Sequence, residues 1–134
     1  MEDALILKYA GPVPRYTSYP TAPHFSEAVG LADYESWLDQ IGPGEAISLY
    51  AHVPYCDRLC WFCACHTKQT LRYDPVATYL QGLHREVASV GGRVNREARV
   101  TALHFGGGSP TLVRPEDMIA LKRSFTDHFT IAPH

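Results

Sequence analysis

The chain has 134 residues, a length that suits one domain. Its 12 Lys and Arg residues and 14 Asp and Glu residues give a formal net charge of −2, which excludes the basic footprint of a nucleic-acid binder. The longest uncharged run, 100–113, contains three consecutive glycines and is too short for a membrane-spanning helix. The acidic start lacks the layout of a secretory signal. We therefore expect a cytoplasmic protein.

Residues 1–45 are expected to form an amino-terminal extension, partly extended and partly helical. The prolines within 11–25 exclude a helix there and favour an extended segment. A short helix is predicted over 31–41, and the Gly-Pro-Gly sequence at 42–44 ends it. Apolar residues recur in this helix at helical spacing: Tyr34, Trp37, Leu38 and Ile41.

Two strands are predicted in the remaining part of the chain, 46–134. The first, 46–53, is short, apolar and bounded by turn residues, which is typical of a strand buried on both faces. The second strand spans 99–105 and leads directly into the three glycines at 106–108. A further strand is due near the end of the sequence.

A helix is predicted after each of these two strands. The first begins at Asp74-Pro75, with Asp74 as its N-cap, and ends at Gly91-Gly92. The second begins at Pro115. Its inward-facing residues are expected to be Met118, Leu121, Phe125 and Phe129.

The order strand, loop, helix, strand, loop, helix indicates an α/β fold with a parallel sheet. Both long loops follow a strand and precede a helix, so they fall at the same carboxyl-terminal edge, where such folds place their sites. A closed barrel of the TIM type needs ~250 residues. We therefore expect 46–134 to be the first part of a partial (β/α) barrel, and the chain to be the front portion of a larger enzyme.

All cysteines of the chain lie in the first of these loops, at Cys56, Cys60, Cys63 and Cys65. Clustered cysteines without a secretory signal are more typical of a metal site than of disulfides. Three thiolates on one loop suit an iron–sulfur cluster that keeps one iron open to a small molecule. Four cysteines would also suffice for a tetrahedral zinc site, although a second pair of cysteines at a distance is missing. The residues alone leave both metals open.

The spacing Cys56-x3-Cys60-x2-Cys63 after the strand ending His52-Val53-Pro54-Tyr55 resembles the radical S-adenosylmethionine superfamily. The sequence Gly-Gly-Gly-Ser-Pro-Thr at 106–111 is similar to the glycine-rich motif of that superfamily. Within it, the sequence Arg-Tyr-Thr-Ser-Tyr-Pro-Thr at 15–21, together with the cysteine loop, resembles the oxygen-independent coproporphyrinogen III oxidases. The resemblance spans nearly the whole chain and implies a radical SAM core that begins at residue 46.

The resemblance implies a [4Fe–4S] cluster bound by Cys56, Cys60 and Cys63, with adenosylmethionine on the fourth iron. Cys65 matches the additional cysteine of the family, which does not bind the cluster. It is the one candidate for a catalytic residue, and the others are unknown.

The resemblance also implies residues that bind adenosylmethionine. Tyr50 and Gly107 match positions that contact a first molecule. Phe62, Gly108 and Ser109 match positions near a second, so one or two molecules are expected. Ser109 keeps the hydroxyl of the threonine that is common in the family and lacks its methyl group.

The activity implied is oxidative decarboxylation of propionate side chains, which converts coproporphyrinogen III to protoporphyrinogen IX in haem biosynthesis. Coproporphyrinogen III would be the substrate, an electron donor would reduce the cluster, and the full-length protein would be a monomer. We expect the present chain to be inactive by itself. The alternatives are a haem-chaperone-like or other radical SAM relative without oxidase activity, and a small zinc-binding domain.

Two further predictions concern residues around the motifs. The segment 15–21 is expected to line a polar pocket, with Arg15 facing a substrate carboxylate; a solvated linker is the alternative. His52 is interpreted either as a core histidine or as a hydrogen-bond donor to a cluster sulfur. His66 and His104 are assigned structural roles.

Overall fold

The computed structural model describes residues 3–10, 21–61, 63 and 65–133. The chain divides into two compact units, Met1–Leu31 and Ala32–His134. In the first unit, α1 (Asp3–Tyr9) is a short helix without buried residues, and η1 (Ala22–His24) is a single 3₁₀ turn. Most of the segment predicted to be extended lies outside the described residues. The division into an extension of 1–45 and a core of 46–134 stays a prediction.

The second unit is built on a parallel sheet with the strand order β1-β4-β5. β1 (Ala46–Val53) has the predicted bounds, and β4 (Arg99–Gly107) continues two residues beyond the predicted end. β5 (Thr130–Ile131) pairs in parallel with the start of β4, where a further strand was expected. The α/β fold with parallel strands is therefore confirmed, and the ends of β1 and β4 meet at one edge of the sheet.

A bulge interrupts the pairing of β1 with β4. Ile47 pairs with Val100, but Ser48 pairs with Ala102, so Thr101 is an extra residue. The Thr101 hydroxyl donates a hydrogen bond to the carbonyl of Ile47 at 3.3 Å. Because of the extra residue, β4 turns Val100, Leu103 and Phe105 toward the same hydrophobic core. Ala102, His104 and Gly106, which pair with Ser48, Tyr50 and His52, therefore face the opposite side.

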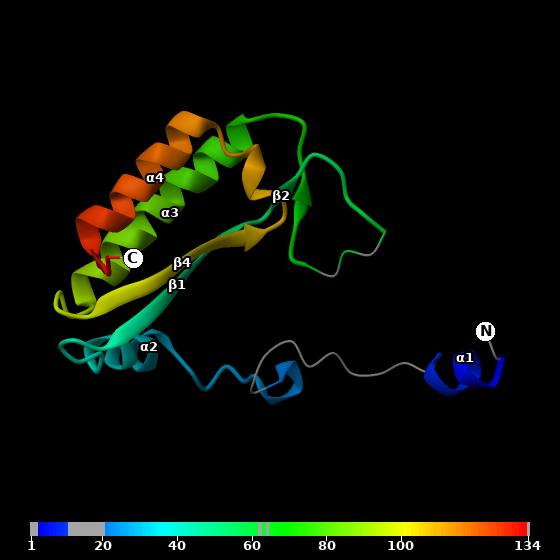
Figure 1. Ribbon diagram of the computed structural model, residues 1–134, viewed down its shortest axis with the longest axis horizontal. Coiled ribbons are helices and arrows are strands. Elements are labelled where there is room, and N and C mark those ends of the chain that lie inside the picture. The colour runs from blue at the N-terminus through cyan, green and yellow to red at the C-terminus, as the bar shows by residue number, and fades with distance from the viewer. Residues whose placement is uncertain (1–2, 11–20, 62, 64, 134) are drawn as a thin grey trace. The chain divides into compact units, whose positions relative to one another are not determined.

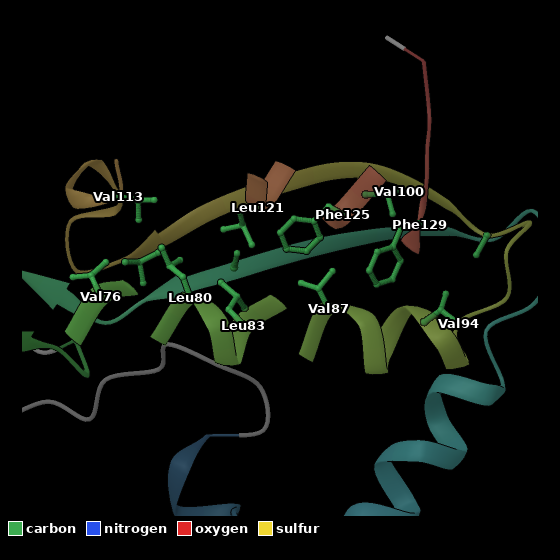
Figure 2. Packing of buried hydrophobic residues seen from close by; sticks show 13 residues of the cluster. Val76, Leu80, Leu83, Val87, Val94, Val100, Val113, Leu121, Phe125 and Phe129 are labelled. Carbon is green, nitrogen blue, oxygen red and sulfur yellow. The ribbon is translucent and has the colours of Figure 1, made fainter. Parts of the chain in front are cut away.

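Two helices that run parallel to each other and opposite to the strands cover one face of this sheet (Figure 1). They are α3 (Asp74–Arg93) and α4 (Pro115–His128), and their apolar stripes meet β1 and β4 in a single core (Figure 2). Leu121 and Phe125 of α4 are buried as predicted, and Phe129 is buried just after the helix end. The core consists of Ala51, Val53, Val76, Leu80, Leu83, Val87, Val94, Ala98, Val100, Val113, Leu121, Phe125 and Phe129.

The expectation that β1 is buried on both faces is wrong. Only Ala51 and Val53 of this strand are buried. Tyr50, on the side opposite the helices, is 61% exposed. The reason is that α3 and α4 pack on one face of the sheet, so that only alternate side chains of β1 reach the core.

The predicted ends of α3 also need correction. Asp74 is the first helical residue rather than the N-cap, a position occupied by Tyr73, and its carboxylate pairs with Arg72 at 3.0 Å. The helix passes through Gly91-Gly92 to Arg93. A Cβ atom on Gly91 would lie 2.6 Å from the Cβ atom of His128 at the end of α4. This glycine therefore permits close packing of two helices instead of ending one.

The side chain of Tyr73 also forms hydrogen bonds with the first turn of α4. The backbone N–H of Arg114, the N-cap residue of α4, donates to the Tyr73 hydroxyl at 3.1 Å. The same hydroxyl donates to the carboxylate of Asp117 in the first turn, and the Arg114 guanidinium lies 4.0 Å from the centre of the Tyr73 ring. Arg114 makes no side-chain cap of its own, so the hydroxyl of a residue from before α3 accepts the hydrogen bond of the N-cap N–H.

Helix α2 (Leu31–Asp39) ends two residues before its predicted end. Its acidic residues hold it to the end of α3, because the guanidinium of Arg93 lies 2.7 Å from Glu35 and 3.2 Å from Asp39. Among the residues that the structure describes, no helix is long and apolar enough to cross a membrane.

Candidate functional site

The cysteine loop is closed at its base by two short parallel strands, β2 (Tyr55–Cys56) and β3 (Lys68–Gln69). The N–H of Lys68 donates to the carbonyl of Pro54 at 2.8 Å, and the N–H of Thr70 donates to the carbonyl of Cys56 at 2.9 Å. Sequence reasoning missed this pair of strands because two residues are too few to carry a periodic pattern. The pairing confines all the cysteines to one loop that emerges from the end of β1.

The glycine turn after β4 lies directly beside the start of this loop. The N–H of Gly108 donates to the carbonyl of Val53 at 2.8 Å, and the N–H of Ser109 donates to the carbonyl of Tyr55 at 2.7 Å. The chain then enters η2 (Pro110–Leu112). These bonds bring together the two loops that sequence analysis placed at the same edge of the sheet.

Two of the glycines are required by this close approach. Gly107 has a φ angle of +106°, which side-chain-bearing residues rarely adopt, and a Cβ atom there would lie 2.8 Å from the carbonyl oxygen of Val53. A Cβ atom on Gly108 would overlap the Tyr55 carbonyl and lie 2.8 Å from the Sγ atom of Cys56. The glycine turn therefore does more than reverse the chain direction. It allows the backbone at Gly108 to lie against Cys56 with no side chain between them.

Tyr50 and His52 occupy the same face of β1, next to the glycine turn. A Cβ atom on Gly106 would lie 2.5 Å from the Tyr50 hydroxyl, so the tyrosine side chain lies against bare backbone there. The Tyr50 hydroxyl is 3.3 Å from Nδ1 of His52, and Nε2 of His52 is 3.3 Å from the carbonyl oxygen of His66. His52 therefore connects β1 with the far part of the cysteine loop. Its role toward a cluster sulfur stays a prediction.

The cysteine thiols differ in their surroundings. No disulfide joins them: Cys56 is buried, Cys63 is half-buried, and Cys60 and Cys65 are exposed. The backbone of Cys65 and the Thr67 hydroxyl, the latter 3.7 Å from Sγ, lower the pKa of the Cys63 thiol. The neighbouring Cys63 raises the pKa of Cys65 above its usual range. Cys63 is thus the more readily ionised of the two, and thiolates are the form that binds metal.

The donor set suits an iron–sulfur cluster in its chemistry. Within the described residues, no three His, Cys, Asp or Glu side chains are arranged so as to hold a metal ion. The thiols of Cys56, Cys60 and Cys63 are nevertheless free and lie on one loop, in which the N–H of Cys63 donates to the carbonyl of Cys60 at 3.0 Å. Thiolates on such a loop are the usual ligands of these clusters.

Some predicted site residues lie outside the described part of the chain. These are Phe62 and residues 15–20 with Arg15. Tyr50, Gly107, Gly108 and Ser109 are described and lie around the shared edge of β1 and β4. A hydrogen bond of 2.6 Å from the Tyr79 hydroxyl on α3 to the carbonyl of His52 also supports this edge, and no motif signalled it.

Comparison with known proteins gives a consistent set of relatives. No family model matches the chain. The chain is 43% identical over 121 residues to an oxygen-independent coproporphyrinogen III oxidase of Bradyrhizobium diazoefficiens, a match that covers 90% of this chain and 27% of the relative. It is 48% identical over 120 residues to the enzyme of the same name from Paracoccus denitrificans, again covering 90% and 27%.

The same likeness extends to a solved structure. HemN, the coproporphyrinogen III oxidase of Escherichia coli and a radical SAM enzyme, matches with a TM-score of 0.80 and 32% sequence identity. The match covers 97% of this chain and 28% of HemN. The chain therefore spans about a quarter of the length of the relatives that it matches, in their amino-terminal part.

Proposed function

Because the chain is a homologue of the amino-terminal part of the oxygen-independent coproporphyrinogen III oxidases, we propose that it forms the front part of an enzyme with that activity. The enzyme would convert coproporphyrinogen III to protoporphyrinogen IX by oxidative decarboxylation of propionate side chains. The observation that carries the proposal is the contact between the glycine turn and the cysteine loop at the shared end of β1 and β4. Parallel α/β folds bind their ligands at this edge.

In this proposal Cys56, Cys60 and Cys63 hold a [4Fe–4S] cluster. The cluster supplies, when bound, the single electron for reductive cleavage of adenosylmethionine. Cys56 is fixed at the base of the loop by its backbone bond from Thr70, and Cys63 has the thiol with the lowered pKa. Cys65, whose thiol has a raised pKa, stays outside the ligand set and is the candidate for a catalytic role.

Adenosylmethionine would occupy the edge beside the cysteine loop. Tyr50 and Gly107 would contact one molecule, and Phe62, Gly108 and Ser109 would lie near a second. What supports this placement is the position of the glycine turn, whose backbone lies against Cys56 at the strand ends where parallel α/β folds bind their ligands. The chain's own contribution is to position ligands and to keep water from the reacting atoms.

The wider setting of the enzyme is proposed on the same basis. The described strands and helices would be the first units of a partial (β/α) barrel, and 1–45 would precede this core. An electron donor would reduce the cluster in the cytoplasm, and the complete enzyme would act as a monomer without a membrane or nucleic-acid partner. The 134 residues alone are expected to give no turnover, because two βα units do not enclose a radical.

Metal reconstitution tests the proposal. Anaerobic treatment of the chain with iron and sulfide is expected to give about four irons per chain and a broad absorption near ~400 nm. Cys56→Ala, Cys60→Ala and Cys63→Ala should each abolish the absorption, whereas the matched variant Cys65→Ala should keep most of it. Tight binding of zinc that requires all of these cysteines would instead indicate a small zinc domain and refute the proposal.

A further inference from the structure

We propose that His104 binds a ligand carboxylate on the face of the sheet that α3 and α4 leave open. The inference rests on the proposed function, which provides two ligands with this group. One is the methionine part of adenosylmethionine, and the other is the set of propionate side chains of coproporphyrinogen III. The two sources share the same chemistry, and the experiment below separates them.

The bulge in β4 determines where His104 lies. After the extra residue Thr101, His104 pairs with Tyr50 of β1, and paired residues of neighbouring strands share a face. Gly106 is on this face too, because the Tyr50 side chain lies against it. Neighbouring strands are about 4.8 Å apart, so a ligand group in contact with Tyr50 is within reach of His104.

The residues of this face share one chemical character. They carry hydroxyl and imidazole groups between small residues, and the part of the face that the structure describes has no carboxylate. A ligand with a negatively charged acceptor group therefore meets donors and no like charge. The face consists of Ala46, Ser48, Tyr50 and His52 on β1 and of Ala102, His104 and Gly106 on β4.

The imidazole of His104 is free to bind a ligand. It is exposed, and it makes no hydrogen bond or ion pair with another described residue. His52 differs because its two ring nitrogens already face the Tyr50 hydroxyl and the His66 carbonyl. His128 likewise has a partner, the carbonyl of Ser124 at 2.8 Å from Nδ1. The structural role expected for His104 thus has no hydrogen bond or ion pair with a described residue to support it.

The experiment measures affinity for two probes. The iron-reconstituted chain is titrated with adenosylmethionine and with coproporphyrin III, the stable oxidised porphyrin that carries the same propionate groups. His104→Ala is expected to weaken binding of one probe about tenfold, as expected for loss of a hydrogen bond to a charged group. His104→Gln, which keeps a donor, should stay within about threefold of wild type. The affected probe identifies the source of the carboxylate.

A matched control and a second readout make the test decisive. His84→Ala, which removes an imidazole from α3, should leave both affinities unchanged. In NMR spectra of the metal-free chain, the ring signal of His104, assigned by its loss in His104→Gln, should shift with the same probe.

The inference is overturned if His104→Ala stays within about twofold of wild type for both probes, or if wild type binds neither. Failure of the proposed function is a separate result, namely absence of iron uptake by wild type. The porphyrin titration of the metal-free chain tests His104 even in that case.

Discussion

The hydroxyl of Tyr73 links the end of the cysteine loop to the start of α4, and its removal should destabilise the fold measurably. Tyr73→Phe deletes a hydrogen bond from the Arg114 N–H and a hydrogen bond to the Asp117 carboxylate. A neutral bond contributes about 1 kcal/mol and a bond to a charged group about 1.5–3 kcal/mol. The phenylalanine ring retains the contact with the Arg114 guanidinium. Since these groups are partly open to water, we expect a net loss of about 2 kcal/mol.

Urea unfolding of the metal-free chain, followed by circular dichroism, measures this loss. With a slope of about 2 kcal/mol per molar urea, the midpoint should fall by about 1 M at unchanged slope. Tyr55→Phe is the matched control, because the Tyr55 ring packs on Tyr79 while its hydroxyl has no hydrogen-bond partner among the described residues. Equal midpoints for Tyr73→Phe and Tyr55→Phe would refute the reasoning.

The same variant has a defined pH dependence. Burial and the hydrogen bond to Asp117 raise the pKa of Tyr73 above its ordinary value of 10.0, so the folded state favours the neutral phenol. The stabilisation is complete below pH 10 and is lost as the pH rises through the folded-state pKa. The difference in unfolding free energy between wild type and Tyr73→Phe should therefore shrink above pH 10, and a growing difference would contradict the assignment.

Four other substitutions test the packing and the ion pairs of the helices by the same unfolding assay. Gly91→Ala should destabilise by roughly 1–3 kcal/mol because its Cβ atom would meet His128, whereas Gly92→Ala, with open space around it, should stabilise by up to about 1 kcal/mol. Leu121→Ala, at a position with no exposed surface, should cost about 2–5 kcal/mol. Arg93→Ala should cost less than about 1 kcal/mol and lose this effect in high salt, because its ion pairs with α2 are open to solvent.

The elements that could be predicted from the sequence are those marked by a short, continuous pattern of residues. β1 was predicted with its bounds because an apolar run lies between Glu45 and Pro54. The inward side of α4 follows from helical spacing, which places Leu121 and Phe125 one turn apart. The pair Gly91-Gly92 predicts a helix end, because the local conformational preference of glycine carries no information about a neighbouring helix. Only the approach of His128 explains a glycine inside α3.

The candidate site depends more on contacts between distant residues. The spacing of the cysteines indicated a metal site and favoured an iron–sulfur cluster over zinc, and the resemblance supported the same metal. The contact of Gly108 with Cys56 follows from backbone hydrogen bonds between loops about fifty residues apart in the sequence. The connection from His52 to the His66 carbonyl has no sequence signature either. Such contacts require the paired strands to be in place before they can be recognised.

The extra residue in β4 has a consequence for how this segment tolerates insertions and deletions. Deleting Thr101 would place Ala102 directly after Val100 and leave every pair of β1 with β4 as it is, with Ser48 still opposite Ala102. Deleting His104 would instead place Phe105, which packs edge-on against Phe125, opposite Tyr50 and turn its side chain away from the core. A change of one residue should therefore be accepted at Thr101 and excluded between Leu103 and the glycine turn. The number of residues in this stretch is thus as much a determinant of the fold as their identity.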